Sequence, residues 1–237
     1  PPGLENPVAR AQEEMMAALV QAQRLCKSFG DVEAVRNASF DVRSNSIAAF
    51  LGENGAGKTT VLKLLLGFLR PDCGRFSVGA ARIGYVPERP AFFPWLRGAE
   101  IVECTARLFG ISRGEAEQRA DILCRRLAFD RRLLGRKAQT YSLGNQKKLS
   151  YLQSLFIRPD LLIVDEPFSA LDPVSIRSVR AIFRELRDQG KTLLLSSHLI
   201  SELEKVCDAF IIIKGGRIVA QGHLAAQSDL ESFFLSF

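Results

Sequence analysis

The stretch Gly52-Glu53-Asn54-Gly55-Ala56-Gly57-Lys58-Thr59-Thr60 decides the fold, because it matches the phosphate-loop pattern G-x-x-x-x-G-K followed by Ser or Thr. It follows the apolar run 47–51, which predicts a buried strand, and precedes the apolar run 61–68, which predicts the first turns of a helix. Glycines in such a turn let backbone N–H groups surround phosphate oxygens, and the helix N-terminus adds partial positive charge. The stretch therefore predicts a nucleoside triphosphate site.

Two side chains of this stretch are expected to contact the ligand directly. Lys58 would reach the β- and γ-phosphates, and the Thr59 hydroxyl would ligate Mg²⁺. The alternative is a glycine-rich turn with an incidental lysine. The strand expected before the stretch and the helix expected after it favour the phosphate site.

A second candidate site lies at the end of the apolar run 161–164, which predicts a buried strand. Asp165 and Glu166 follow it, and successive strand residues point to opposite faces, so the two carboxylates are expected to differ in role. Asp165 suits the Mg²⁺ side. Glu166 would face the γ-phosphate and orient or deprotonate the attacking water. An acidic strand end alone is a weak signal, but here it follows a phosphate loop in the same sheet.

Alternating strands and helices predict an α/β fold with a parallel, doubly wound sheet. The continuous apolar runs 161–164 and 192–195 predict strands buried on both faces. Strands over 19–27 and 38–42 predict a small antiparallel element at the N-terminal edge. Helices are expected over residues 99–109, 112–127, 146–156 and 174–189, and short strands over 74–78 and 82–86. Phosphate chemistry would lie at the carboxyl ends of the parallel strands.

The expected elements divide the chain into one domain with two tails. The domain covers residues 19–222, and a mostly helical insertion of about residues 89–157 separates its two α/β portions. We expect residues 1–18 to be a flexible tail or a tag, and residues 223–237 to be a C-terminal tail.

Composition indicates a soluble cytosolic domain. The chain has 237 residues and a net charge of +6, and no apolar run approaches the roughly 18 residues of a membrane span. The basic balance permits nucleic acid or an anionic membrane surface as partner and selects neither. We interpret the basic run within 125–137 as a solvated face, with a membrane contact as the alternative. The scattered cysteines are expected to be free thiols rather than metal ligands or a disulfide set: Cys26, Cys73, Cys104, Cys124 and Cys207.

The order of the motifs resembles the ATP-binding cassette (ABC) family, the nucleotide-binding subunits of ABC transporters, from about Leu19 to Gly222. Further stretches carry the resemblance. They are Phe29-Gly30, where an aromatic residue stacks on adenine; Val86-Pro87-Glu88, where a loop usually carries glutamine; Tyr141-Ser142-Leu143-Gly144-Asn145, at the signature that normally reads Leu-Ser-Gly-Gly-Gln; Ser169-Ala170-Leu171-Asp172-Pro173, at the D-loop; and Ser196-Ser197-His198, at the switch histidine.

The resemblance implies the fold of P-loop NTPases (RecA-like): a parallel sheet core with an N-terminal antiparallel β element and a helical subdomain. It implies ATP and Mg²⁺ as cofactors, and ATP hydrolysis with Glu166 and His198 as catalytic residues. ATP would be bound by Phe29, Gly52, Glu53, Asn54, Gly55, Ala56, Gly57, Lys58, Thr59 and Thr60, and Mg²⁺ by Thr59, Glu88 and Asp165. Ser142, Gly144 and Asp172 would contact ATP on a second copy.

The resemblance also implies partners. Two cassettes would pair head to tail, as a homodimer or with a different cassette, and a separate transmembrane permease subunit would form the transport pathway. The chain would then be cytoplasmic, peripheral on the inner face of the cell membrane. The alternative is a non-transport ABC ATPase, either an assembly factor or a nucleic-acid-associated clamp. We do not expect nucleic acid as partner, because the insertion is short and has no zinc module or long coiled coil.

Departures from the family pattern affect the signature and the glutamine loop. Leu143 replaces the first glycine of the signature and Asn145 its glutamine, so the contact with a partner could be loosened. Glu88 replaces the loop glutamine and adds negative charge beside the triphosphate. The link between residues 78 and 83 is short, which predicts a trimmed antiparallel element. We still expect an active ATPase, because the catalytic pair is kept.

Some of these residues also have a structural interpretation. Phe29 could belong to the core, and His198 could end a strand. Asp172 before a proline is a favourable helix N-cap. We favour adenine stacking for Phe29 and a γ-phosphate contact for His198, whereas the interface role of Asp172 rests on the resemblance alone.

Overall fold

The computed structural model describes residues 18–224 and residue 234. The tail or tag predicted over residues 1–18 lies outside the described residues except for its last position. The C-terminal tail predicted over 223–237 lies outside them as well, except for residues 223, 224 and 234.

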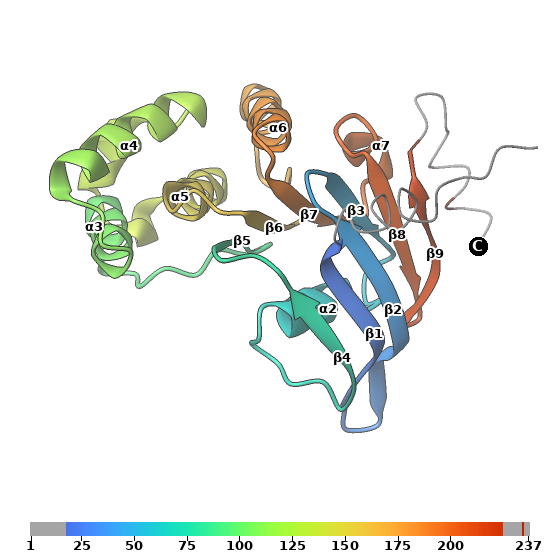
Figure 1. Ribbon diagram of the computed structural model, residues 1–237. Helices are drawn as coiled ribbons and strands as arrows, with labels where there is room; N and C mark the ends of the chain where they lie inside the picture. The colour runs from blue at the N-terminus through green and yellow to red at the C-terminus, as the bar shows by residue number, and fades with distance from the viewer. Residues whose placement is uncertain (1–17, 225–233, 235–237) are drawn as a thin grey trace, which may run out of the picture.

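A six-stranded sheet forms the centre of the domain (Figure 1). Its strands follow the order β5 (Ile83–Val86), β6 (Leu161–Asp165), β7 (Thr192–Ser197), β3 (Ile47–Leu51), β8 (Ala209–Lys214) and β9 (Arg217–His223). Neighbouring strands are parallel along β5, β6, β7, β3 and β8, and β9 pairs antiparallel with β8. Every residue of β3, β6 and β7 is buried, as strands covered on both faces require. The predicted parallel core is therefore confirmed.

Two apolar layers cover the two faces of this sheet. On one face lie helix α2 (Lys58–Leu65) and an antiparallel sheet of strands β2 (Val32–Arg43), β1 (Ala18–Phe29) and β4 (Cys73–Val78). On the other face lie helices α6 (Pro173–Asp188) and α7 (Ile200–Leu203) (Figure 1). Alternate residues of β6 pack into the two layers. Leu161 and Ile163 lie on the α2 side, and Leu162 and Val164 lie on the α6 side.

The predicted helical insertion lies beyond the β5 edge of the sheet (Figure 1). Its helices are α3 (Gly98–Leu108), α4 (Arg113–Arg126) and α5 (Leu143–Phe156), with 3₁₀ turns over Arg131–Gly135 and Ala138–Thr140. Ser112 caps α4 by accepting a hydrogen bond from the Glu115 N–H at 3.4 Å. Helix α5 begins earlier than the predicted residue 146, because Ser142 is its N-cap.

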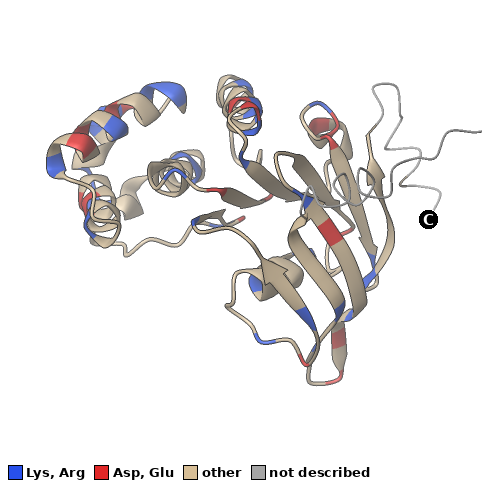
Figure 2. Ribbon diagram, in the orientation of Figure 1, with Lys and Arg blue, Asp and Glu red and all other residues tan. Residues whose placement is uncertain are grey.

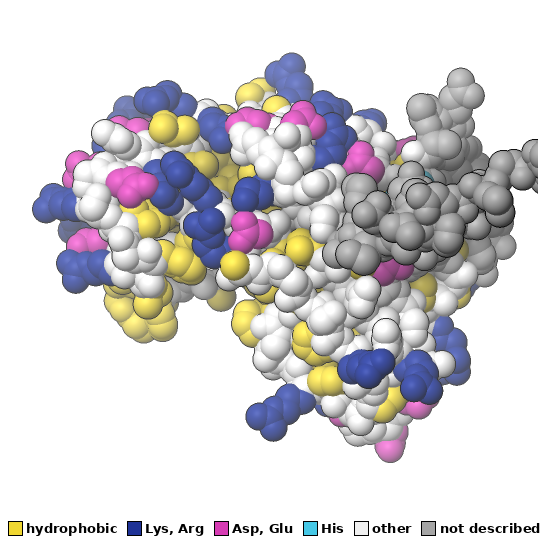
Figure 3. Space-filling model, in the orientation of Figure 1, with side chains coloured by type: hydrophobic (Ala, Val, Ile, Leu, Met, Phe, Trp, Pro, Cys, Tyr) yellow, Lys and Arg dark blue, Asp and Glu magenta, His cyan; other side chains and the backbone are white. Residues whose placement is uncertain are grey.

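The surface of the helical insertion carries mixed charge. Arg126 forms an ion pair with Glu185 on α6, and Arg132 forms one with Asp130 at 2.9 Å. Lys and Arg side chains are interspersed with Asp and Glu over this part of the molecule (Figures 2 and 3). This favours a solvated face for the basic run. Over the described part of the chain, no helix has both the length and the apolar character needed to cross a bilayer.

The cysteine prediction is wrong for one pair, because Cys26 on β1 and Cys73 on β4 form a disulfide. The two residues are partners in the antiparallel β1–β4 pairing, with their Cα atoms 5.0 Å apart. They are 47 residues apart in sequence, so no local pattern signals the bond. Cys104, Cys124 and Cys207 are free thiols, as expected.

Replacing Cys73 with serine should lower the free energy of unfolding by about 2–4 kcal/mol, because the crosslink closes a long loop and restricts the unfolded chain. Urea denaturation in oxidising buffer, followed by circular dichroism, measures the change. The matched control is Cys104→Ser, which removes an exposed free thiol and should change stability by less than about 0.5 kcal/mol. An unfolding midpoint of the unmodified protein that does not respond to reductant would contradict the crosslink.

Candidate active site

A cavity of about 350 Å³ lies at the carboxyl ends of β3 and β6. Its lining residues are Ala34, Asn54, Gly55, Gly57, Lys58, Thr59, Thr60, Glu88, Asp165 and Glu166. The structure thus brings together residues that the sequence assigned from three separate motifs. The carboxyl ends of parallel strands are where α/β folds bind ligands, so this cavity is the candidate active site.

Close backbone contacts explain two glycines of the phosphate loop. Gly57, the N-cap residue of α2, has φ +106°, and a Cβ atom there would lie 2.4 Å from the carbonyl oxygen of Ala34 on β2. A Cβ at Gly52 would lie 2.5 Å from the carbonyl oxygen of Ile213 on β8. Side chains are therefore excluded at both positions, and the loop presents backbone to the cavity. Such a cradle at a helix N-terminus fits the phosphates of a nucleotide.

Lys58 is the cation of the cavity. Its Nζ donates to the carbonyl oxygens of Gly52 at 2.6 Å and Glu53 at 3.1 Å, so the side chain lies across its own loop. Burial lowers the pKa of Lys58, and the nearby carboxylates of Glu166 and Asp165 oppose that shift. The ammonium is therefore positioned where phosphate oxygens would replace the carbonyls.

Oxygen atoms suited to Mg²⁺ gather around Asp165. Its Oδ2 accepts a hydrogen bond from Thr59 Oγ1 at 2.8 Å, and its Oδ1 accepts one from Ser196 Oγ on β7. Glu88 lines the same cavity. Among the described residues, no group of three or more His, Cys, Asp and Glu side chains is arranged to hold a metal ion, so a metal here would take its remaining ligands from phosphate and water. Hydroxyl and carboxylate donors of this kind fit Mg²⁺.

The carboxylate of Glu166 is fixed by the residues that follow β7. Its Oε2 accepts a hydrogen bond from Ser197 Oγ at 2.7 Å. Its Oε1 accepts one from the His198 backbone N–H at 3.1 Å and lies 2.8 Å from His198 Nδ1. Glu166 also has φ +48°, in the left-handed region that costs a non-glycine residue about 1–3 kcal/mol. A strained residue held by several contacts at a cavity edge is a candidate for a catalytic role.

Ser196 and Ser197 were not among the site residues predicted from the sequence, although the resemblance included them in the switch stretch. Each hydroxyl orients one of the adjacent carboxylates, Ser196 that of Asp165 and Ser197 that of Glu166. Strands β6 and β7 are neighbours with Asp165 opposite Ser196, so the pairing register creates both contacts. Hydroxyl residues at the end of a predicted neighbouring strand were the available signal.

The signature residues are absent from the cavity lining of their own chain. Ser142 caps α5 by accepting a hydrogen bond from the Asn145 N–H at 3.3 Å. A Cβ at Gly144 would lie 2.6 Å from the carbonyl oxygen of Ala170, so this glycine permits close packing against the D-loop. The Leu143 side chain between them is 68% exposed. The surface they form is thus available to another molecule.

Asp172 is a helix N-cap, as its structural interpretation predicted. Its carboxylate accepts hydrogen bonds from the Ser175 N–H at 2.9 Å and the Ser175 hydroxyl at 2.6 Å, and Lys148 Nζ lies 3.3 Å away. The hydrogen bonds from Ser175 hold the pKa of Asp172 well below its usual range. A contact with a second copy remains a prediction.

Phe29 lies at the exposed end of β1 and does not line the cavity. Half of its surface is exposed, which excludes the core interpretation, and the Lys27 ammonium lies 5.7 Å from the ring centroid. Ala34, on the strand that follows, borders the phosphate loop. Adenine stacking therefore remains a prediction that the exposure of the ring permits.

Lys147 is a charged residue near the site that the sequence did not reveal. It lies on α5, and its Nζ donates to the carbonyl oxygens of Pro87 at 2.9 Å and Asp165 at 2.8 Å. Burial lowers the pKa of Lys147 to about 8, and Asp165, Glu166 and Glu88 oppose the shift. No sequence pattern distinguishes this buried lysine from a solvated one.

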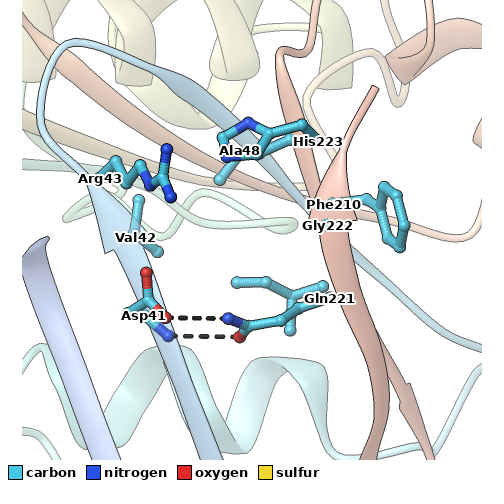
Figure 4. Close-up of a pocket in the computed structure, with 10 residues that line it drawn as sticks. Asp41, Val42, Arg43, Ala48, Phe210, Gln221, Gly222 and His223 are labelled. Carbon is cyan, nitrogen blue, oxygen red and sulfur yellow. Dashed lines mark hydrogen bonds between the residues drawn. The ribbon is translucent and has the colours of Figure 1, made fainter. Parts of the chain in front are cut away.

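A second cavity, of about 210 Å³, lies between β2 and β9 and contains none of the predicted site residues (Figure 4). Gln221 Nε2 donates to Asp41 Oδ1 at 2.8 Å, and the Asp41 N–H donates to Gln221 Oε1 at 3.4 Å. This reciprocal pair joins the antiparallel sheet to the last strand of the central sheet. We assign no ligand to this cavity.

The phosphate loop between β3 and α2, together with the carboxylates that end β6, defines a P-loop nucleoside triphosphatase. A family model described as "ABC transporter" matches residues 35–169. An uncharacterized ABC transporter ATP-binding protein of Methanocaldococcus jannaschii is 34% identical over 209 residues, which are 88% of this chain and 79% of that protein. The linearmycin resistance ATP-binding protein LnrL of Bacillus subtilis is 30% identical over 215 residues, which are 86% of this chain and 69% of that protein. The chain belongs to the ATP-binding cassette family, the nucleotide-binding subunits of ABC transporters.

Solved structures agree with the fold. An ATP-binding subunit of an ABC transporter has a TM-score of 0.85 and 27% identity, and the match covers 92% of this chain and 98% of that one. A dimeric ATP-binding cassette with bound ADP and Pi has a TM-score of 0.78 over 88% of this chain and all of its own, and its 20% identity supports the fold alone. The predicted fold class is confirmed, and family membership supports ATP binding and ATP hydrolysis.

Proposed function

We propose that this chain is an Mg²⁺-dependent ATPase that powers transport through a separate membrane subunit. The observation that carries the ATPase part of the proposal is the orientation of Glu166, while family membership supports the transport part. Its carboxylate is held by Ser197 and His198 at the edge of a cavity that also contains Lys58 and Thr59. A carboxylate fixed beside a triphosphate site can activate the attacking water.

Binding and hydrolysis use different parts of the cavity. The loop N–H groups and Lys58 would hold the phosphates, and Phe29 would stack on adenine. Thr59, Asp165 and Glu88 would hold Mg²⁺, which when bound offsets the charge on the phosphate oxygens. The hydrogen bond between the Thr59 and Asp165 side chains supports this assignment, because it brings two of the proposed ligands together.

In the hydrolysis step, Glu166 would accept the proton of the attacking water. The Ser197 hydroxyl and the His198 backbone N–H hold the carboxylate in one orientation, which reduces the reorganisation needed at the moment of reaction. The His198 ring lies against the same carboxylate and would contact the γ-phosphate as well.

A second cassette would complete the site. Ser142, Gly144 and Asp172 lie outside the cavity of their own chain, as residues that act on a partner's nucleotide would. Leu143 exposes its side chain on this surface. The proposed arrangement is a head-to-tail pair, either of two copies or of this chain with another cassette.

An exposed aromatic pair offers a contact for the membrane subunit. Phe93 and Trp95, in the link from β5 to α3, are 62% and 63% exposed, and their ring centroids lie 5.4 Å apart. Exposed aromatic residues are enriched at protein interfaces. If a membrane subunit binds here, the chain lies at the inner face of the membrane, and this location is part of the proposal.

Co-purification tests the proposed partner. The chain, with an affinity tag, is isolated in mild detergent from cells that express its chromosomal neighbours, and ATP hydrolysis is measured with and without the recovered membrane protein. We expect a membrane protein to co-purify and to raise the ATPase rate. Stimulation by DNA or RNA instead would support the clamp alternative and contradict the transport role.

Leu143→Gly should strengthen ATP-induced dimerisation of the isolated chain. A branched, exposed side chain at this position should hinder close approach of the partner's γ-phosphate, so tethering to a membrane subunit would have to supply the missing effective concentration. Sedimentation velocity with and without ATP, in a Glu166→Gln background that cannot reset the dimer, measures the effect. An unchanged monomer–dimer balance would show that Leu143 points away from the interface.

A further inference from the structure

One ammonium group connects three elements behind the candidate active site. Lys147, on α5, donates to the carbonyl oxygens of Pro87 at 2.9 Å and Asp165 at 2.8 Å. Pro87 follows β5 and Asp165 ends β6, and these are neighbouring parallel strands. The side chain is 1% exposed, so the contacts are shielded from water. A buried ammonium needs negative partners, because leaving it uncompensated costs several kcal/mol.

The wall of the cavity carries unbalanced charge. Its charged lining residues are one cation, Lys58, and three carboxylates, Glu88, Asp165 and Glu166. The phosphates of ATP bring further negative charge to the same place. Like charges repel each other more strongly in a partly buried site than in water. Glu88 therefore weakens the binding of metal-free nucleotide unless a cation of the protein compensates for it.

We propose that Lys147 is that cation: a positioning residue that compensates for Glu88 from behind the cavity wall and so permits nucleotide binding. The inference rests on the proposed function of the cavity as the ATP site. The ammonium binds the carbonyl oxygen of Pro87, the residue directly before Glu88, and the carbonyl oxygen of Asp165, which lines the same cavity as Glu88. The positive charge of Lys147 and its position beside the residues around Glu88 thus match the excess negative charge of the cavity wall.

The neighbouring lysine provides a matched control. Lys148 is also buried on α5, but its Nζ donates to the Ala128 carbonyl at 3.0 Å and lies 3.3 Å from Asp172 Oδ2. The Lys148 side chain therefore contacts a different part of the protein from Lys147. Removing this charge should produce no energetic coupling to Glu88.

A double-mutant cycle tests the compensation. The four proteins are the unmodified chain, Glu88→Gln, Lys147→Gln and the double variant, and the probe is a fluorescent ATP analogue titrated in EDTA without Mg²⁺. Glu88→Gln keeps the shape of the side chain and removes its charge, and Lys147→Gln removes the charge while keeping N–H donors on a shorter side chain. We expect Lys147→Gln to weaken binding about tenfold with Glu88 present and at most about threefold in the Glu88→Gln background, since the charges interact in a partly buried site.

The control cycle replaces Lys147→Gln with Lys148→Gln, and its effect should be equal in both backgrounds. Equal losses for Lys147→Gln in both backgrounds would indicate a purely structural role and overturn the proposal. If Lys147→Gln folds only together with Glu88→Gln, that rescue supports it; failure to fold in both backgrounds overturns it.

Thermal unfolding of the nucleotide-free proteins separates this inference from the proposed function. Lys147→Gln should lower the unfolding temperature more with Glu88 present than in the Glu88→Gln protein, whether or not nucleotide binds. If the unmodified chain binds no nucleotide, the ATP site is wrong and the claim that compensation permits nucleotide binding falls with it. The unfolding temperatures then still decide whether Lys147 compensates for Glu88.

Discussion

Glu166→Gln should lower the rate of ATP hydrolysis by about 10²–10⁴-fold and leave ATP binding intact. The amide has the shape of the carboxylate and can still bond to the Ser197 hydroxyl, but it cannot accept a proton from water. Steady-state phosphate release with Mg²⁺ measures turnover, and titration with a fluorescent ATP analogue measures binding. Because bound ATP is no longer consumed, the variant should also accumulate an ATP-dependent dimer in sedimentation experiments.

The control for this variant is Glu117→Gln, which makes the same change on α4, where the carboxylate pairs with Arg113 at the surface. It should keep the rate of the unmodified protein. Hydrolysis by Glu166→Gln at that same rate would show that another group activates the water. Loss of both binding and hydrolysis would instead point to a damaged cavity.

Strand and loop positions were predictable where the residues themselves carry the constraint. The β3 strand was predicted with the bounds that the structure shows, because the continuous apolar run 47–51 permits burial on both faces and the glycine loop ends it. The start of α5 was harder to predict. Its N-cap, Ser142, belongs to a motif that the sequence assigned to a partner contact, so its local role was overlooked.

Contacts between distant segments could not be predicted, because they depend on strand register and helix packing. The Cys26–Cys73 disulfide follows from the pairing of β1 with β4. The contacts of Ser196 and Ser197 with the two carboxylates follow from the pairing of β6 with β7. The contacts of Lys147 depend on the packing of α5 against β5, and no periodicity in the sequence predicts that packing. Motifs therefore located the site, while its supporting residues needed the tertiary structure.

Lys58→Ala should weaken ATP binding by about tenfold to more than a hundredfold, because hydrogen bonds to charged groups contribute about 1.5–3 kcal/mol each. The loss also leaves Glu88, Asp165 and Glu166 as the charged residues of the cavity wall, which adds repulsion toward the phosphates. The carbonyl oxygens of Gly52 and Glu53 lose their donor, but the space left by the Lys58 side chain adjoins the cavity that this side chain lines, so water can replace the ammonium. The fold should therefore survive, with an unchanged circular-dichroism spectrum.

The matched control is Lys63→Ala, which removes the same charge from an exposed position on the same helix. Its effect on affinity should stay within about twofold, because exposed charges are screened by water and salt. A difference between the two variants assigns the loss to the position of the Lys58 ammonium rather than to net charge. If Lys58→Ala is folded and binds the fluorescent ATP analogue as tightly as the unmodified protein, the loop between β3 and α2 is not the phosphate site.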